Sequence, residues 1–318
     1  MPSLVLSVLR QPSAALPTSG PHAAGRRLLI GAAIVAPLVL AACGTDATAG
    51  DQEAADGETH SHDDGSHPHP EDVTLEHVHG LGVDPADDTL YAGTHYGLVR
   101  ISPDGELTRI ADRVQDFMGF TVVGPEYYLA SGHPGEGQDG PGNLGLIEST
   151  DGGQTWETMS LAGEADFHAL DAAGDVIYGY SGGRLLVSED GVEWADRGEM
   201  RIADLAVDPA DPQRLLATTE AGLVVSEDAG KNFTAVAGAP LLVLVDVAAD
   251  GGTVAGVAPD GTVFVSTDGG RTWEERGSVG GAPAALTVEG DEVYVAVGAA
   301  VLVSTDEGET FTELYRES

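Results

Sequence analysis

Short apolar runs separated by glycine, aspartate and proline follow one another from about residue 73 to the end of the chain. Two well-defined sets cover residues 202–207, 214–218, 222–226 and 232–236, then 285–288, 292–297, 301–304 and 310–315. These runs are rich in β-branched residues and bounded by turn formers, a pattern typical of strands joined by hairpins. No stretch after residue 70 keeps apolar residues at the helical period. The pattern therefore predicts an all-β fold.

One motif recurs between these runs: a serine, any residue, an aspartate, a glycine-containing turn, then Trp or Phe. The five copies are STDGGQTW (149–156), SEDGVEW (188–194), SEDAGKNF (226–233), STDGGRTW (266–273) and STDEGETF (304–311). By subtraction, their serines lie 39, 38, 40 and 38 residues apart. A constant period of this length indicates repeated units, and four strands per unit is the blade of a β-propeller. The unit that holds the first copy begins at about 116 and ends at about 160, and one further unit upstream, at about 77–110, brings the prediction to a six-bladed β-propeller with four-stranded blades over residues 73–318.

The aspartate of each motif has a local mechanical role. Its carboxylate accepts hydrogen bonds from the backbone of its own turn, and the closing aromatic ring packs between neighbouring blades. The motif resembles the Asp-box, or bacterial neuraminidase repeat, of sialidases, sortilin-type receptors and photosystem-assembly propellers. We expect these aspartates to be structural: Asp151, Asp190, Asp228, Asp268 and Asp306.

The N-terminal segment predicts export and lipidation. Two arginines (26–27), a 13-residue apolar run (28–40) and small residues form a secretory signal that is short for a membrane span. The sequence LAAC (40–43) matches the lipobox of bacterial lipoproteins, and Cys43 is the chain's single cysteine. We expect a signal peptide over 1–43, lipid on Cys43, and an extracytoplasmic protein anchored to the cell membrane. The sequence does not decide between twin-arginine export and general secretion. It also leaves open whether translation starts at a codon further downstream.

Residues 44–72 contain almost nothing to bury and predict a disordered, acidic tether. Its HSHDDGSHPHP segment carries four histidines typical of loose metal binding, His60, His62, His67 and His69. Over the whole chain, 14 basic and 52 acidic residues give a net charge of −38. This charge excludes nucleic acid as a partner of the propeller, because phosphate binding needs clustered Lys and Arg.

The remaining histidines fall on one face of the predicted propeller. In a four-stranded blade, the start of the first strand and the turn between the second and third lie on one face, and the Asp-boxes lie on the other. The first strands of three blades open as HVHGL (77–81), DFMGF (116–120) and DFHAL (166–170), and the second strands of two blades end at His95 and His133. An insertion, PGEGQDGPGN (134–143), lengthens one turn over the same face. Imidazole suits copper and zinc, and thioether sulfur favours cuprous ion, so the candidate metal ligands are His79, Met118, His168, His95 and His133.

These opening segments, with SGHP (131–134) and the boxes, resemble a family of bacterial Asp-box propeller proteins. Many of these are lipoproteins, and they are commonly labelled glycosyl hydrolase or exo-sialidase-like. Sialidases share an early Arg-Ile-Pro segment, which this sequence lacks, and three active-site arginines, whereas few arginines of this sequence fall on the predicted functional face. A generic glycosidase needs two carboxyl groups, for which Asp116 and Asp166 are the candidates. The leading hypothesis is a non-enzymatic, lipid-anchored propeller that binds a ligand, partner or transition metal (copper or zinc) on this face. The alternatives are a glycoside hydrolase and an assembly factor for envelope proteins.

Overall fold

The computed structural model describes residues 73–111, 114–135 and 137–317 of the 318-residue chain. Cys43 and the four tether histidines lie outside these residues, so lipidation, the tether and its metal binding stay predictions. The described residues form strands, turns and no helix, as predicted. Accordingly, this part of the chain offers no helix with the length and apolar character needed to cross a bilayer.

Six antiparallel sheets of four consecutive strands confirm the predicted blades. Blades one to three are β1 (Val78–Asp84), β2 (Thr89–Thr94), β3 (Gly97–Ile101) and β4 (Leu107–Arg109); β5 (Asp116–Gly124), β6 (Tyr127–His133), β7 (Leu146–Ser149) and β8 (Glu157–Ser160); and β9 (Ala169–Ala173), β10 (Val176–Ser181), β11 (Arg184–Ser188) and β12 (Trp194–Glu199). Blades four to six are β13 (Asp204–Asp208), β14 (Asp211–Thr219), β15 (Gly222–Ser226) and β16 (Thr234–Ala235); β17 (Leu244–Val247), β18 (Val254–Val257), β19 (Thr262–Ser266) and β20 (Glu274–Ser278); and β21 (Pro283–Glu289), β22 (Glu292–Val297), β23 (Ala300–Ser304) and β24 (Thr312–Arg316).

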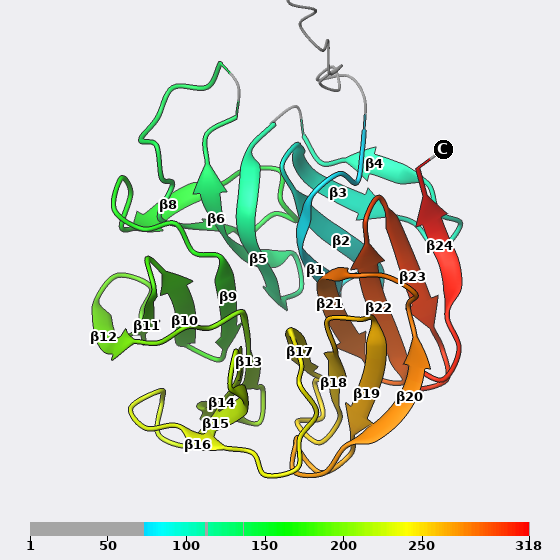
Figure 1. Ribbon diagram of the computed structural model, residues 1–318. Coiled ribbons are helices and arrows are strands. Elements are labelled where there is room, and N and C mark those ends of the chain that lie inside the picture. The colour runs from blue at the N-terminus through cyan, green and yellow to red at the C-terminus, as the bar shows by residue number, and fades with distance from the viewer. Residues whose placement is uncertain (1–72, 112–113, 136, 318) are drawn as a thin grey trace, which may run out of the picture. The chain divides into compact units, whose positions relative to one another are not determined.

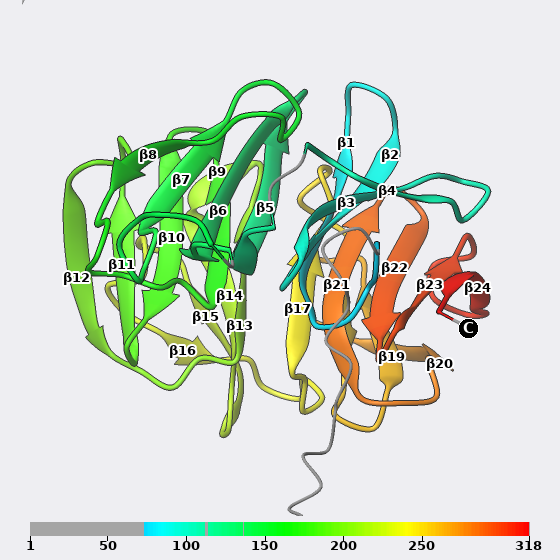
Figure 2. The ribbon, with the colours of Figure 1, turned by 90° about the horizontal axis from the view of Figure 1, so that it is seen from above.

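The first strand of every blade lies innermost, around a common axis (Figure 1). Each of these strands contacts the first strand of the next blade, from β1 to β5 and onward to β21, and β21 returns to β1. The view from above shows β1 and β21 side by side (Figure 2). The ring therefore closes between blades one and six.

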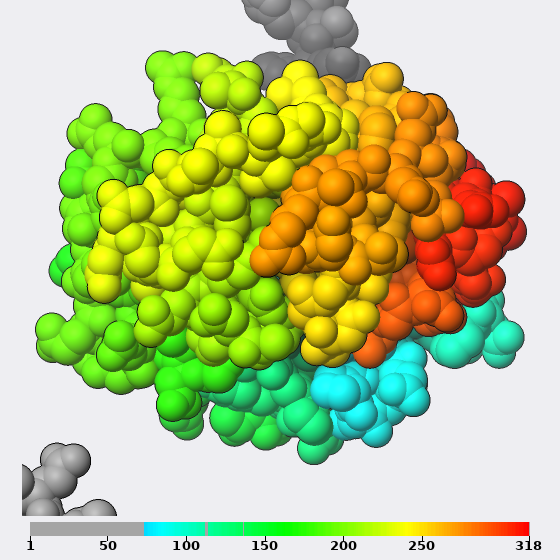
Figure 3. All heavy atoms as spheres, turned by 90° about the horizontal axis from the view of Figure 1, so that it is seen from below, coloured from blue at the N-terminus to red at the C-terminus, as the bar shows by residue number. Residues whose placement is uncertain are grey.

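Apolar side chains hold neighbouring blades together. The described residues form six hydrophobic clusters, one for each pair of neighbouring blades. The cluster at the closure joins Leu75, Val78 and Leu81 of blade one with Ala285 and Val301 of blade six. Figure 3 shows the cyan atoms of blade one packed directly against the orange atoms of blade six. Within the described residues no strand is shared between these blades, so packing alone closes the ring.

The Asp-box turns join the third and fourth strands of their blades. In the first full box, Asp151 Oδ1 accepts hydrogen bonds from the Thr155 backbone N–H (2.9 Å) and the Ser149 hydroxyl (2.9 Å), and Ser149 Oγ accepts from Gly153 N–H (2.8 Å). The box also donates Gly152 N–H to the carbonyl of Glu126, in the turn between β5 and β6, at 2.9 Å. This box is thereby bonded within its own turn and to the turn beside it, on the face of the ring opposite the histidines.

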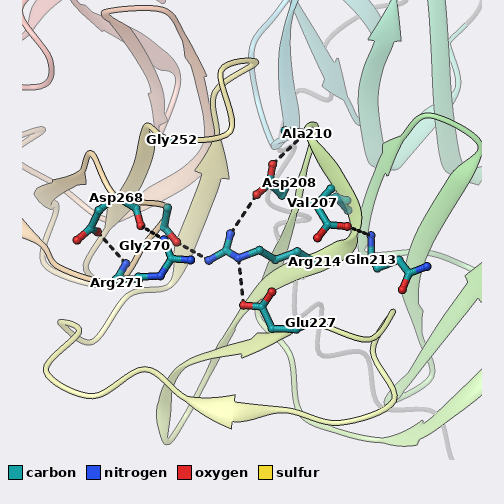
Figure 4. Close-up of polar contacts among 12 residues, drawn as sticks. Val207, Asp208, Ala210, Gln213, Arg214, Glu227, Gly252, Asp268, Gly270 and Arg271 are labelled. Carbon is teal, nitrogen blue, oxygen red and sulfur yellow. Dashed lines mark hydrogen bonds and ion pairs between the residues drawn. The ribbon is translucent and has the colours of Figure 1, made fainter. Parts of the chain in front are cut away.

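A buried arginine adds a polar tie between blades four and five (Figure 4). The Arg214 side chain is 8% exposed and lies 3.4 Å from Asp208 Oδ2 and 3.3 Å from Glu227 Oε1. Its Nη2 also donates to the carbonyl of Gly269, in the Asp-box of blade five. Burial of this cation is offset by three oxygen partners, as buried charges require.

Candidate functional site

Three neighbouring blades bring the predicted histidines onto one face. His79 lies in β1 and His95 directly follows β2, while His133 ends β6 and His168 directly precedes β9. Asp116, the first residue of β5, pairs across the sheet with His133. We call these residues, together with His77 and Asp166, the histidine face. Register alone places their backbones together, because strand starts and the turn that follows the second strand meet at one edge of a blade.

The side chains divide into two groups, and the first contains His79, His95 and Asp116. One potential ligand atom of each lies within 4.8 Å of the other two. His95 Nδ1 is 3.6 Å from Asp116 Oδ1, and the His95 ring stacks on that of His79 with centroids 4.9 Å apart. Two imidazoles and a carboxylate are a donor set that zinc, copper and other first-row divalent ions accept.

Burial leaves two polar atoms of this group without a hydrogen bond. Among the described residues, His79 Nε2 and Asp116 Oδ1 are buried and make no hydrogen bond. Burial, together with neighbouring His95 and His77, lowers the pKa of His79 to about 4. Burial likewise raises the pKa of Asp116, against the opposing effect of His95 and His133. His79 is therefore neutral near pH 7, which is the state in which imidazole binds metals.

Asp166 organises the second group. Its Oδ2 lies 2.9 Å from His168 Nε2 and 3.4 Å from His133 Nε2. The predicted candidates are thus brought onto one face but not into one cluster: His79 and His95 join Asp116, whereas His133 and His168 join Asp166. Met118 holds the equivalent position in β5 and is half-buried, and its sulfur stays a predicted ligand.

Sequence reasoning left His77 out of the ligand set. His77 adopts a left-handed backbone conformation (φ 55°), which is uncommon for a residue other than glycine. Its ring lies 4.8 Å from that of His95, so His95 is flanked by His77 and His79. The alternation His-Val-His was the available signal, because residues two apart in a strand point to the same face.

A cavity of about 460 Å³ extends from the histidine face, lined by all six innermost strands. His79 and His168 line it, as do three half-buried carboxyl groups, those of Asp171, Asp204 and Asp246. Burial raises their pKa values to about 6, about 7 and about 8, respectively. Each carboxyl accepts a backbone N–H from the next blade, from Val207, Val245 and Val288, respectively.

Comparisons with known proteins agree with this fold. The family described as "BNR/Asp-box repeat" matches residues 147–158 and 264–275. No curated protein matches the sequence. Similar solved structures include a gluconolactonase from Xanthomonas campestris (14% identity over 72% of this chain and 86% of that chain, TM-score 0.58) and a chain of the nidogen/laminin complex (14%, 72% and 93%, TM-score 0.56).

A GH74 xyloglucanase from Xanthomonas campestris is 16% identical over 76% of this chain, with a TM-score of 0.48, and the chain spans 55% of that enzyme's length. Likeness at these identities shows the fold alone. The chain is a six-bladed β-propeller that carries BNR/Asp-box repeats.

Proposed function

We propose that the histidine face binds a divalent transition-metal ion, zinc or copper, through His79, His95 and Asp116. The observation that carries this proposal is the convergence of three donors within 4.8 Å, from three separate segments. Two of the residues present buried, unpartnered ligand atoms. A buried polar atom without a partner costs free energy, and a bound cation removes that cost for both atoms at once.

Three protein ligands leave room on a tetrahedral or five-coordinate ion for a further ligand. The His95 side chain is 36% exposed and that of Asp116 is 24% exposed, so the site is reached from solvent. A partner or small molecule with a lone pair would complete the coordination. Binding of such a ligand at the metal is the leading function that we propose for this propeller.

Titration calorimetry with ZnCl₂ tests the proposal. The protein is the full chain in which His60, His62, His67 and His69 are replaced by alanine, which we call the tether-silent chain, because those histidines would bind zinc themselves. On this background His79→Ala, His95→Ala or Asp116→Asn should weaken one binding event at least about 100-fold. The control Glu220→Gln alters an acid that is 79% exposed and pairs with Arg201, and should change nothing. Unchanged zinc binding by His79→Ala would refute the site.

A glycoside hydrolase using Asp116 and Asp166 is the second candidate. Burial raises the pKa of Asp116, which is the direction that a general acid requires. A panel of aryl glycosides tests it: Asp116→Asn should abolish turnover, while chelators should leave it intact. Absence of turnover by the parent protein across the panel would eliminate the hydrolase. The assembly-factor alternative stays a prediction.

Anchoring through lipid on Cys43 completes the proposed function. It rests on the LAAC segment and places the propeller outside the cytoplasm. Radiolabelled palmitate should enter the membrane-bound protein, and Cys43→Ser should abolish labelling. Equal labelling of both proteins would overturn the anchor.

A further inference from the structure

The innermost strands surround the axis of the ring (Figure 1), and the central cavity follows them over their whole length. Its lining includes His79 and His168, near the starts of β1 and β9, and Pro85 and Gly174, directly after the same two strands end. By subtraction, 79 to 85 and 168 to 174 are each six residues, a rise of about 20 Å. The volume of 460 Å³ then averages to a cross-section of about 23 Å². The cavity is therefore long and narrow, and it suits an extended chain better than a fused-ring molecule.

Both ends of the cavity reach solvent. At the histidine end, the His168 side chain is 55% exposed. At the opposite end, the lining residues Pro209 and Glu289 are exposed. A small molecule thus has a path into the cavity from outside.

Backbone hydrogen bonds hold the three carboxyl groups of the cavity in place. Asp204 Oδ2 accepts from Val245 N–H and its Oδ1 from Leu205 N–H, both at 2.9 Å. Asp171 and Asp246 are held in the same way, by one donor from their own strand and one from the next blade. A carboxylate offers about four lone-pair sites, so each of the three keeps at least one for a ligand.

The cavity supplies no lysine or arginine to balance these acids. None of the described residues that line it carries either side chain. Burial raises the pKa values of Asp204 and Asp246, and repulsion from Asp171 raises both further. A cation within the cavity would offset both effects, because it stabilises the ionised carboxylates.

A single inorganic ion does not match the arrangement of the three acids. Among the described residues, three ligand atoms lie within 4.8 Å of one another only at His79, His95 and Asp116. The carboxyl groups of the cavity are therefore too widely spread to surround one ion, whose oxygen ligands lie within about 2.6 Å of it. Several cationic nitrogens separated by methylene groups match spread carboxyl groups in a narrow cavity.

We propose that the central cavity binds a linear aliphatic polyamine, whose ammonium groups pair with Asp171, Asp204 and Asp246. Its methylene groups would contact apolar lining residues such as Val122 and Leu205. This site does not depend on the proposed metal centre: His79 borders both, but His95 and Asp116 do not line the cavity.

Titration calorimetry with spermidine tests the proposal. The full chain is freed of metal and kept in about 0.15 M NaCl, which screens surface charges beyond about 8 Å. We expect one spermidine per chain, and binding at least about 10-fold weaker for butylamine, which carries a single ammonium group.

Variants locate the bound polyamine. Asp204→Asn should weaken spermidine binding at least about 10-fold, whereas Asp116→Asn, in the metal centre, should leave it unchanged. Glu220→Gln, at an acid that is 79% exposed, is the matched control and should bind as the parent does. Near-UV circular dichroism shows whether each variant is folded.

The pH dependence supplies a test in the parent protein. An ammonium group favours ionised carboxylates, so affinity should rise from about pH 5.5 to about pH 7.5. Protons should leave on binding near pH 7, seen as a heat that differs between phosphate and Tris buffers. Surface acids are ionised throughout this range and release none. His79, His168 and Glu289 are the other titratable lining residues, and His168→Gln should keep the proton release.

The outcomes separate this proposal from the metal centre. Loss of spermidine binding in Asp204→Asn with zinc binding retained supports the cavity site, whatever the metal titrations show. Spermidine binding that is kept in Asp204→Asn but lost in Asp116→Asn overturns it and places the polyamine on the histidine face. No binding by the parent, or several weak events without proton release, also overturns it.

Discussion

At the scale of single residues, polar side chains on the two faces of the propeller differ in how fully they are hydrogen-bonded. On the Asp-box face, carboxylates are saturated by donors: Asp306 accepts from the backbone and hydroxyl of Thr310 and from the hydroxyl of Ser304. On the histidine face, His79 Nε2 and Asp116 Oδ1 are buried without a donor among the described residues. Saturated groups stabilise a turn, whereas unsatisfied ones are available to bind a ligand.

Arg214 gives a residue-scale prediction on the saturated face. Arg214→Ala leaves Asp208 and the Gly269 carbonyl without their partner, so the free energy of unfolding should fall by about 2–4 kcal/mol. Arg214→Lys should recover only part of the loss, because an ammonium group lacks the planar fork that reaches three oxygens. Urea denaturation measures both. The exposed Arg271, which bonds the backbone of Asp268, supplies the control, and Arg271→Ala should cost well under about 1 kcal/mol. Equal losses for the two alanine variants would contradict the inter-blade role of Arg214.

At the scale of elements, the innermost strands pack so closely that they need glycine at defined points. A Cβ added to Gly119 in β5 would lie 2.5 Å from the carbonyl oxygen of Phe167 and 3.2 Å from Leu170 Cβ, in and beside β9. A Cβ on Gly80 in β1 would lie 2.6 Å from the Phe120 carbonyl oxygen in β5. These approaches bring the starts of β1, β5 and β9 together, and with them the histidines.

Replacement of Gly119 tests this packing. Gly119→Ala should lower the free energy of unfolding by about 1–3 kcal/mol, because backbone must move to admit the methyl group. Gly124, at the other end of the same strand, has nothing within 4 Å of an added Cβ. Gly124→Ala should therefore be neutral or slightly stabilising. Denaturant midpoints compare the two, and a larger loss for Gly124→Ala would show that the packing has been misread.

Sequence patterns predicted these elements well because strand and turn signals are local. Residues 222–226 and 292–297 were predicted as strands and match β15 and β22 residue for residue. The run 232–236 shrinks to Thr234–Ala235 in β16, since an outer strand pairs on one side only. The division of the histidines into two groups was not predicted. Register fixes which face a residue occupies, whereas the partner of His133 depends on side-chain angles and on the path of an inserted turn.

At the scale of the whole molecule, three half-buried acids make the stability of the fold sensitive to pH. Asp171, Asp204 and Asp246 have folded-state pKa values of about 6, 7 and 8, above the ordinary 3.8. The folded protein therefore keeps protons that the unfolded chain releases, and the stability from these groups is full below about pH 4 and lost through about pH 6–8. The Asp-box aspartates have the opposite effect on the pH dependence of stability, because hydrogen bonds lower the pKa of Asp268 and Asp306 to about 2. Their contribution is present above the ordinary pKa and lost as pH falls toward 2.

The free energy of unfolding should accordingly decline from about pH 5 to pH 8. Asp204→Asn should flatten part of that decline, at the cost of one acceptor for the Leu205 or Val245 N–H. Asp260→Asn is the control. The pKa of Asp260 is lowered from its ordinary value, so this acid does not titrate between pH 5 and 8 and its replacement should leave the slope unchanged. Urea titrations at several pH values measure the slope. A profile that stays flat between pH 5 and 8 would show that the three acids are ionised throughout and would contradict the prediction.

The closure between blades one and six has a consequence for how such a ring changes over time. Every blade is made of four consecutive strands, and the closing joint is packed like the other five. The strand order is the same in all six sheets, so no blade is distinguished as the first. A gene rearrangement that joined the two ends and opened any connector between blades would leave every hydrogen-bonded ladder intact. The histidine-bearing blades thus keep their neighbours wherever the chain starts, and the binding face depends on which blades are adjacent rather than on which comes first.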